Sequence, residues 1–273
     1  MTAFVETAAP AALAFDQLAA DYDASFTFSA IGKSQRDVVW NRLLSVFQPG
    51  EHILELNCGT GIDALFMTNA GLRVTACDAS PRMIEMARRR AATAKSQTNA
   101  KFLTLPTEDL HKLPESCFYD GLLSNFAGLN CVRDLRTFVT QAARCLKPGA
   151  PLLLCFLTRY CLWEIAHYLL RGNPRKALRR CSGTSVARVG DFAFPVYYRT
   201  LTELRHAFAP EFRLIAVEGV GITVPPSYLE RWIVNHPRLL RGMSAIDEVI
   251  RTWPGTRLVG DHVLLHFEKV CPC

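Results

Sequence analysis

The 273-residue sequence lacks any apolar run of the roughly 20 residues that a membrane-spanning helix needs. Its first residues, Met1 to Pro10, have neither a basic start nor a separate apolar stretch, so they match a secretory signal peptide poorly. Internal repeats and low-complexity segments are also missing. These absences argue against a membrane protein and a repeat architecture, and we expect a cytoplasmic location.

The ten cysteines lack the spacing of a disulfide framework or a zinc site. Most are scattered singly, several of them within strand-like runs, and we interpret these as buried free thiols. Cys271-Pro-Cys273 has no second pair near it, so we interpret it as a tail. No cluster of aspartate and asparagine typical of a catalytic metal site is recognisable, and we expect no metal.

The sequence carries a formal net charge of +6, and its basic residues are unevenly distributed. One run is concentrated between residues 171 and 188: Arg171, Arg175, Lys176, Arg179, Arg180 and Arg188. A solvated helix face is the ordinary interpretation. The alternative is a docking patch for an anionic substrate, a carrier protein or a lipid surface. Nucleic acid is not expected as a partner, because no aromatic residues interleave with the basic ones in a binding motif.

Strand-like and helix-like runs alternate along the middle of the chain. The apolar spacing predicts strands at 51–57, 72–77, 100–104, 118–124 and 150–157, and helices at 11–24, 34–47, 62–70, 81–94 and 132–146. This alternation predicts an α/β fold with a Rossmann-like, doubly wound, mostly parallel sheet and helices on both faces. Further on we expect a helix at 201–209, helical periodicity in 225–252 and strands at 211–222 and 260–270, the last an edge or penultimate strand.

The most informative segment runs from His52 to Asp63 and reads HILELNCGTGID. It predicts a buried strand that ends in an acidic, glycine-rich turn and opens a helix. Gly59 and Gly61 carry no Cβ, so the backbone can approach a ligand closely. Asp78 closes the next apolar run, where a carboxylate can accept hydrogen bonds from ribose hydroxyls. The order of these features predicts a nucleotide-binding site.

Two classes of ligand fit this pattern. The run Gly59-Thr-Gly-Ile-Asp-Ala64 satisfies the dinucleotide form G-x-G-x-x-A. Glu55, inside the strand, argues against a dinucleotide, because an acid beside the cradle repels a pyrophosphate but not a ligand with an ammonium group and a sulfonium. The sequence also has no recognisable Tyr-x-x-x-Lys pair. An NAD-dependent oxidoreductase and a non-catalytic cofactor-binding protein of the same fold stay open as alternatives.

The run from Glu55 to Gly61 resembles motif I of the class I S-adenosylmethionine-dependent methyltransferases. The run from Val74 to Ala87 resembles the second strand and following helix of that family, and weaker similarity continues to about Thr158 and returns at 260–267. The resemblance implies S-adenosylmethionine as cofactor and methyl transfer to a small, largely apolar acceptor. Oxygen is favoured as the methylated atom, with carbon and nitrogen open.

The resemblance also implies which residues in the first half of the site contact the cofactor. Glu55 would lie near the methionine moiety, and Asp78 would bind the ribose. Ala79 and Met83 would flank the adenine. The turn beneath the methionine moiety would consist of Asn57, Cys58, Gly59, Thr60 and Gly61.

Further contacts are expected after the third and fourth strands. Pro106 takes the place of an acid that often binds the adenine amino group, so the backbone of Thr107 and Glu108, or the Glu108 carboxylate, would serve instead. Asn125 and Phe126 would lie at the carboxyl end of the fourth strand, facing the methionine part. Tyr22 resembles a tyrosine that closes over the cofactor in related enzymes.

We expect one methyltransferase domain over residues 1–273, with a helical cap at about 11–48, a cofactor-binding core at about 49–158, and acceptor-pocket inserts at about 159–200 and 223–257. The block 159–200 would be a mobile lid, with its basic run facing solvent. The candidate bases are His167, Tyr168 and His206, because a histidine near pKa 6.5 suits proton abstraction at neutral pH. His167 and Tyr168 are the predicted catalytic residues, because they fall in this block.

Overall fold

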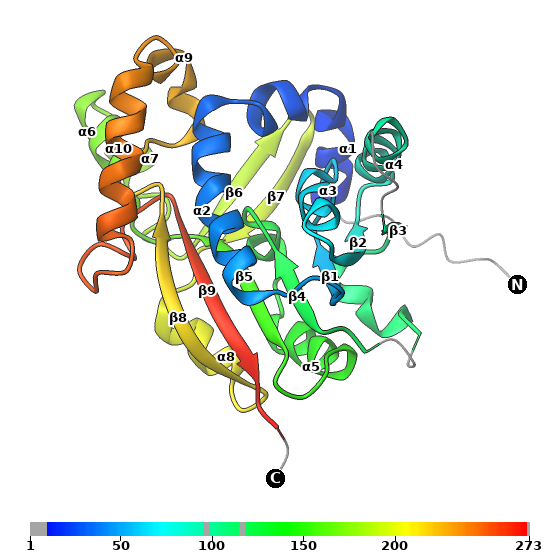
Figure 1. The fold of residues 1–273 in the computed structure, drawn as a ribbon. Coiled ribbons are helices and arrows are strands. Elements are labelled where there is room, and N and C mark those ends of the chain that lie inside the picture. The colour runs from blue at the N-terminus through cyan, green and yellow to red at the C-terminus, as the bar shows by residue number, and fades with distance from the viewer. Residues whose placement is uncertain (1–9, 95–98, 115–117, 272–273) are drawn as a thin grey trace, which may run out of the picture.

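A computed structural model describes residues 10–94, 99–114 and 118–271 (Figure 1). The segment Met1–Ala9, Cys117 and Cys273 therefore lie outside the described residues. The centre is a seven-stranded sheet in the order β3-β2-β1-β4-β5-β9-β8. Its strands are β1 (His52–Leu56), β2 (Arg73–Asp78), β3 (Ala100–Thr104), β4 (Gly121–Ser124), β5 (Pro151–Leu157), β8 (Phe212–Val220) and β9 (His262–Lys269).

The predicted α/β fold is confirmed, and the sheet is mostly parallel. Strands β1 to β5 pair in parallel, and β9 runs antiparallel to both β5 and β8. Strand β9, the last along the chain, is thus the penultimate strand of the sheet. We expected either an edge or a penultimate position for it. The strand predicted at 118–124 begins only at Gly121, because Tyr119 makes just an isolated bridge to Leu146.

Helices cover both faces of the sheet, which explains the continuous apolar character of its strands. One face packs against α2 (Ala30–Val46), α3 (Ile62–Asn69) and α4 (Pro81–Thr93). The other packs against α5 (Leu135–Cys145) and α8 (Leu201–Phe208). Alternate residues of β1 face opposite sides, since Ile53 packs with the first group and Leu54 with the second. Within the described part of the chain, no helix is both long and apolar enough to cross a membrane.

The N-terminal cap consists of α1 (Pro10–Tyr22), a π-helical turn η1 (Asp23–Thr27) and α2. Helix α1 packs against α4 and against a separate two-stranded hairpin of β6 (Thr184–Val189) and β7 (Phe192–Tyr197). Ala14 of α1 is fully buried against Phe194 and Val196 of this hairpin. Figure 1 shows α1 and the hairpin together on one side of the sheet.

The two blocks that look irregular in sequence contain regular structure. The first holds α6 (Leu162–Leu170) and α7 (Pro174–Ala177) besides the hairpin, and the second holds η4 (Ser227–Leu229), α9 (Glu230–Ile233) and α10 (Pro237–Ile250). Helices α6, α7, α9 and α10 gather at one corner of the molecule (Figure 1). Trp163 joins the two blocks, because its ring lies 6.3 Å from that of Trp232 and its Nε1 donates to the Thr223 carbonyl at 2.8 Å.

The basic run does not face solvent along its whole length, so that expectation is wrong for its central members. Arg180 is 5% exposed and pairs with Glu164 at 2.8 Å and with Asp261 at 2.9 Å. Arg179 pairs with the other oxygen of Glu164 at 2.7 Å. A buried charge requires a partner, so the sequence places arginines here to neutralise Glu164 and Asp261. These pairs attach α6 and the segment after α7 to the start of β9.

Arg180→Met tests this cluster by leaving the Asp261 carboxylate buried without its cation. We expect the free energy of unfolding to fall by about 3–5 kcal/mol in a denaturant titration, the usual cost of breaking one buried ion pair. Arg213→Met is the matched control, because its pair with Glu268 is largely exposed, and such pairs contribute about 1 kcal/mol or less. Equal losses for the two variants would contradict a structural role for the buried cluster.

Candidate cofactor-binding site

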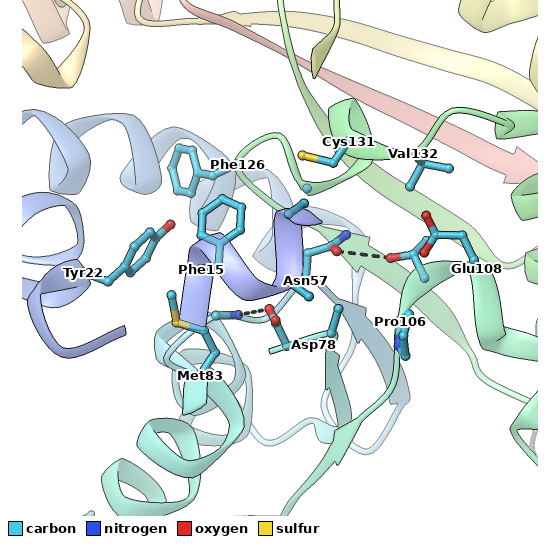
Figure 2. Close-up of a pocket in the computed structure, with 16 residues that line it drawn as sticks. Phe15, Tyr22, Asn57, Asp78, Met83, Pro106, Glu108, Phe126, Cys131 and Val132 are labelled. Carbon is cyan, nitrogen blue, oxygen red and sulfur yellow. Dashed lines mark hydrogen bonds between the residues drawn. The ribbon is translucent and has the colours of Figure 1, made fainter. Parts of the chain in front are cut away.

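A cleft with a mainly apolar lining lies at the carboxyl ends of β1, β2 and β4 (Figure 2). The sheet order reverses between β1 and β4, and such a switch point is where open α/β sheets bind ligands. The cleft holds about 780 Å³ of empty space, part of it open to solvent. It is lined by Ala11, Ala12, Phe15, Tyr22, Asn57, Gly59, Asp78, Ala79, Met83, Pro106, Thr107, Glu108, Phe126, Gly128, Cys131 and Val132.

The backbone is strained at the two strand ends that form the floor of the cleft. Asn57 follows β1 with a φ of 55°, and Phe126 and Ala127 follow β4 with φ of 46° and 67°. Non-glycine residues rarely adopt these angles, and they concentrate at functional sites. A Cβ on Gly128 would lie 2.4 Å from the Asn57 Cβ, so only glycine fits there. The backbone of the segment after β4 therefore packs directly against the side chain that follows β1.

Asp78 connects the end of β2 to the turn after β1. Its two carboxylate oxygens accept hydrogen bonds from the backbone N–H groups of Gly59 and Ser80, each at 2.9 Å; Figure 2 shows the first of these. Burial raises the pKa of Asp78 above its usual value, although the two N–H groups act in the opposite direction. A carboxylate has about four acceptor positions, so Asp78 keeps acceptor capacity for a hydroxyl group of a ligand.

The two glycines of the turn have different surroundings. Gly59 has a φ of 53°, and a Cβ built on it would meet only the Tyr22 ring, at 3.8 Å. Gly61 has a φ of 77°, and its Cβ would lie 2.8 Å from the Ala87 Cβ and 3.1 Å from the Phe102 ring. Gly59 therefore borders open space in the cleft, whereas Gly61 lets α4 pack against the turn.

One side of the cleft is formed by the segment after β3. The Thr107 hydroxyl donates to the Asn57 side chain at 3.1 Å (Figure 2), and Asn57 donates in turn to the Ser124 hydroxyl at 3.1 Å. Pro106 and Glu108 also line the cleft, and the Glu108 side chain is exposed at its rim. Thr107 and Glu108 thus line the same cleft as Asp78, and their contact with an adenine stays a prediction.

Aromatic rings from the N-terminal cap cover the cleft. Phe15 and Tyr22 of α1 lie with their ring centres 6.5 Å apart, and Phe26 meets Phe126 edge to face at 4.9 Å. Burial raises the pKa of Tyr22 to about 12, so its phenol stays protonated at neutral pH. Only Tyr22 was predicted here; Ala11, Ala12 and Phe15 were missed, although they share a face of the same helix.

A smaller polar cavity adjoins the cleft and shares Tyr22, Asn57, Gly59 and Phe126 with it. Its centre is Asp63, which pairs with Arg36 at 3.2 Å and accepts hydrogen bonds from Trp40 at 2.7 Å and Asn125 at 3.0 Å. The Arg36 guanidinium also lies 5.0 Å from the centre of the Phe126 ring. The predicted residues Cys58, Thr60 and Asn125 line this cavity. Arg36 was missed, because no spacing in the sequence links α2 to the glycine turn, whereas Asp63 was missed although it follows Gly61 by two residues at the start of α3.

Glu55 lies near the carboxyl end of β1, just before the turn, and lines neither cavity. It is 1% exposed, and its Oε2 has no hydrogen-bond partner among the described residues. Burial raises its pKa well above the usual value, and the nearby Asp63 and Asp78 carboxylates add to this effect. An unpartnered buried carboxylate beside a cleft is a group that a cationic ligand can stabilise.

The structure does not bring the predicted catalytic residues to the cleft. His167 and Tyr168 lie on α6, where the His167 Nε2 contacts the Arg171 guanidinium at 2.8 Å and both rings contact Tyr228. The lining of both cavities lacks them, and it also lacks His206, which is exposed on α8. In the described segments, no group of three or more His, Cys, Asp or Glu side chains could hold a metal ion.

Comparison with known proteins gives the family context. A family model described as a methyltransferase domain matches residues 53–149. The chain is 30% identical over 173 residues to a demethylmenaquinone methyltransferase of Streptomyces avermitilis, covering 59% of this chain and 67% of that protein. It is 32% identical over 145 residues to the Tropheryma whipplei protein of the same name, but this match covers only 52% of this chain and 56% of the relative.

A longer match joins the chain to a malonyl-[acyl-carrier protein] O-methyltransferase of Serratia marcescens, with 28% identity over 216 residues and 78% of each protein covered. Among solved structures, phosphoethanolamine N-methyltransferase 2 of Haemonchus contortus in complex with S-adenosyl-L-methionine superposes with a TM-score of 0.60 at 17% identity, covering 94% of this chain and 57% of that one. The latter likeness concerns the fold alone. Together with the sheet order and the glycine turn, these matches show that the chain belongs to the class I S-adenosylmethionine-dependent methyltransferases.

Proposed function

We propose that this methyltransferase holds S-adenosylmethionine in the cleft between β1, β2 and β4 and methylates an oxygen of a small, largely apolar acceptor. The observation that carries the proposal is the Asp78 carboxylate, fixed against the open side of Gly59 with acceptor positions left for a ribose. The N-terminal cap at about 11–48, the cofactor core at about 49–158 and the cytoplasmic location stay predictions.

In this arrangement the cofactor extends from the cleft into the adjoining polar cavity. Asp78 would bind the ribose hydroxyls, and Ala79 and Met83 would flank the adenine. The adenine amino group would meet the backbone of Thr107 and Glu108, since Pro106 offers no carboxylate.

The methionine end would reach the polar cavity lined by Arg36, Asp63 and Asn125. Glu55, just before the turn, would ionise when the ammonium and sulfonium charges arrive, because nearby positive charge lowers the pKa of a buried carboxyl. The ionised Glu55 carboxylate would also repel the pyrophosphate of NAD, so the charge beside the turn favours S-adenosylmethionine over NAD.

When bound, S-adenosylmethionine supplies a methyl group already activated by its positive sulfur. The protein then has to position the acceptor and exclude water, which contributes much of the rate of such a displacement. Phe15, Tyr22 and Phe126 are placed to do this at the cleft. Tyr22 stays protonated, so it can donate a hydrogen bond but not act as a base.

None of the three predicted bases lines the cleft, and the two acids in the lining of the larger cavity, Asp78 and Glu108, are assigned above to the cofactor. An alcohol would need a base, whereas a carboxylic acid or an acidic phenol is already ionised at neutral pH. The Serratia marcescens relative is an O-methyltransferase by name. We therefore favour an ionised oxygen acceptor with an apolar body.

Methyl transfer with isotope-labelled S-adenosylmethionine tests the acceptor atom. We expect label to enter apolar carboxylic acids or acidic phenols, and treatment with base to release volatile methanol if the product is a methyl ester. Transfer only to a carbon or nitrogen acceptor, with label stable to base, would contradict oxygen methylation. Calorimetry with S-adenosylmethionine and NAD provides the control for cofactor choice.

Asp78→Ala tests the ribose contact. The variant removes two charge-assisted hydrogen bonds, each contributing roughly 1.5–3 kcal/mol, so the affinity for S-adenosylmethionine in calorimetry should fall at least tenfold. Asp78→Asn keeps the shape and one acceptor and should bind with intermediate affinity. If a folded Asp78→Ala protein binds as tightly as the parent, the ribose lies elsewhere.

The matched pair Gly59→Ala and Gly61→Ala separates ligand approach from packing. Both substitutions strain a left-handed backbone by roughly 1–2 kcal/mol. Gly61→Ala should lose about 1–3 kcal/mol more in thermal or denaturant unfolding, because its methyl group meets α4. Gly59→Ala should instead lose cofactor affinity while remaining the more stable of the two. The reverse order of stabilities would contradict this division.

A further inference from the structure

The corner formed by α6, α7, α9 and α10 exposes many large apolar side chains. Leu170 is 89% exposed. A group of neighbouring exposed apolar side chains usually marks an interaction site. The further exposed apolar residues of this corner are Leu162, Leu169, Leu178, Tyr228, Trp232, Val234 and Leu239. They come from two separate blocks of sequence that the fold brings together (Figure 1).

Contacts between aromatic rings hold the two blocks together. Tyr228 lies 5.4 Å from the His167 ring and 6.0 Å from the Tyr168 ring, while Trp232 contacts Trp163 and, at 5.7 Å, His236. The predicted catalytic pair thus belongs to an aromatic cluster near the surface. Aromatic residues with one apolar and one polar side are enriched where proteins meet the membrane–water interface.

Positive charge predominates at this corner, and the one exposed acid of its four helices, Glu248 near the end of α10, pairs with Arg251. The exposed basic side chains of the corner are Arg171, Arg175, Lys176, Arg231, Arg238 and Arg241. The segments 160–178 and 225–246 contain only two acids, and both have partners within the protein. Glu164 is buried and pairs with Arg179 and Arg180. Glu230 accepts hydrogen bonds from the backbone N–H groups of Ala30 and Ile31 at 2.7 and 3.0 Å. None of the six cations forms an ion pair with a carboxylate among the described residues.

We propose that this corner docks the protein on an anionic lipid surface. Exposed leucines and tryptophan would enter the interface, while the flanking arginines and lysine meet lipid phosphates. A second copy of this chain fits less well, because a symmetric contact would oppose basic groups to basic groups. The inference does not depend on which acceptor is methylated or on cofactor binding.

Sedimentation with lipid vesicles tests the proposal on the whole protein without cofactor. The parent should bind vesicles of phosphatidylcholine containing about one-third phosphatidylglycerol, and binding should weaken as salt rises, because surface charges are screened. Pure phosphatidylcholine vesicles should bind it much more weakly. Failure to bind the anionic vesicles at low salt would overturn the proposal, and would leave an acidic protein as the partner to seek.

Paired variants assign the binding to this corner. Arg175→Glu with Arg238→Glu should weaken binding to the anionic vesicles at least 25-fold, since each basic residue near such a surface contributes about fivefold. Leu169→Ser with Leu170→Ser should weaken it while leaving unfolding unchanged. Arg205→Glu on α8 and Leu44→Ser on α2 are the exposed controls and should bind nearly as the parent does. Equal loss in the control variants would mean that net charge alone drives binding and would overturn the assignment.

Discussion

The hydrogen bond from the Gly59 N–H to the Asp78 carboxylate is the contact on which the site depends. It fixes the turn after β1 against the end of β2, and the second Asp78 oxygen holds the start of α4 through Ser80. With the turn fixed, Asn57 adopts a left-handed backbone and reaches Thr107 and Ser124 on its two sides. Four strand ends are thereby aligned around one cleft, and its floor is backbone that a ligand can approach.

The segments added to this sheet have two separate tasks. The hairpin β6–β7 supports α1, which carries Phe15 and Tyr22 over the cleft. Helices α6, α7, α9 and α10 instead form a corner of their own, joined to β9 by the buried pairs of Arg180 with Glu164 and Asp261. A segment attached through buried charges is costly to detach, so these contacts favour a fixed corner over a lid that moves as a whole.

The sheet, its helices and much of the lining of the two cavities could be read from the sequence because the signals are local. The strand periodicity, the glycine turn and the acid at the end of β2 lie within about 30 residues of one another. Twelve of the fourteen predicted contact residues line one of the two adjoining cavities, all but Glu55 and Gly61. Arg36 and Phe15 could not be found in this way, since only tertiary packing brings α1 and α2 to the turn. The solvent-facing expectation for Arg179 and Arg180 was wrong for the same reason: their partners are a buried acid on α6 and another about 80 residues further on.

The most direct measurement of the central claim is a crystal structure with the demethylated cofactor, S-adenosylhomocysteine, bound. The account predicts the ribose hydroxyls at roughly 3 Å from the Asp78 carboxylate, as in a charge-assisted hydrogen bond. The adenine should lie beside Met83, and the amino acid end should point toward Arg36 and Asp63. A ligand bound away from the β1–β4 junction, or one with its adenine at the Arg36 end, would contradict it.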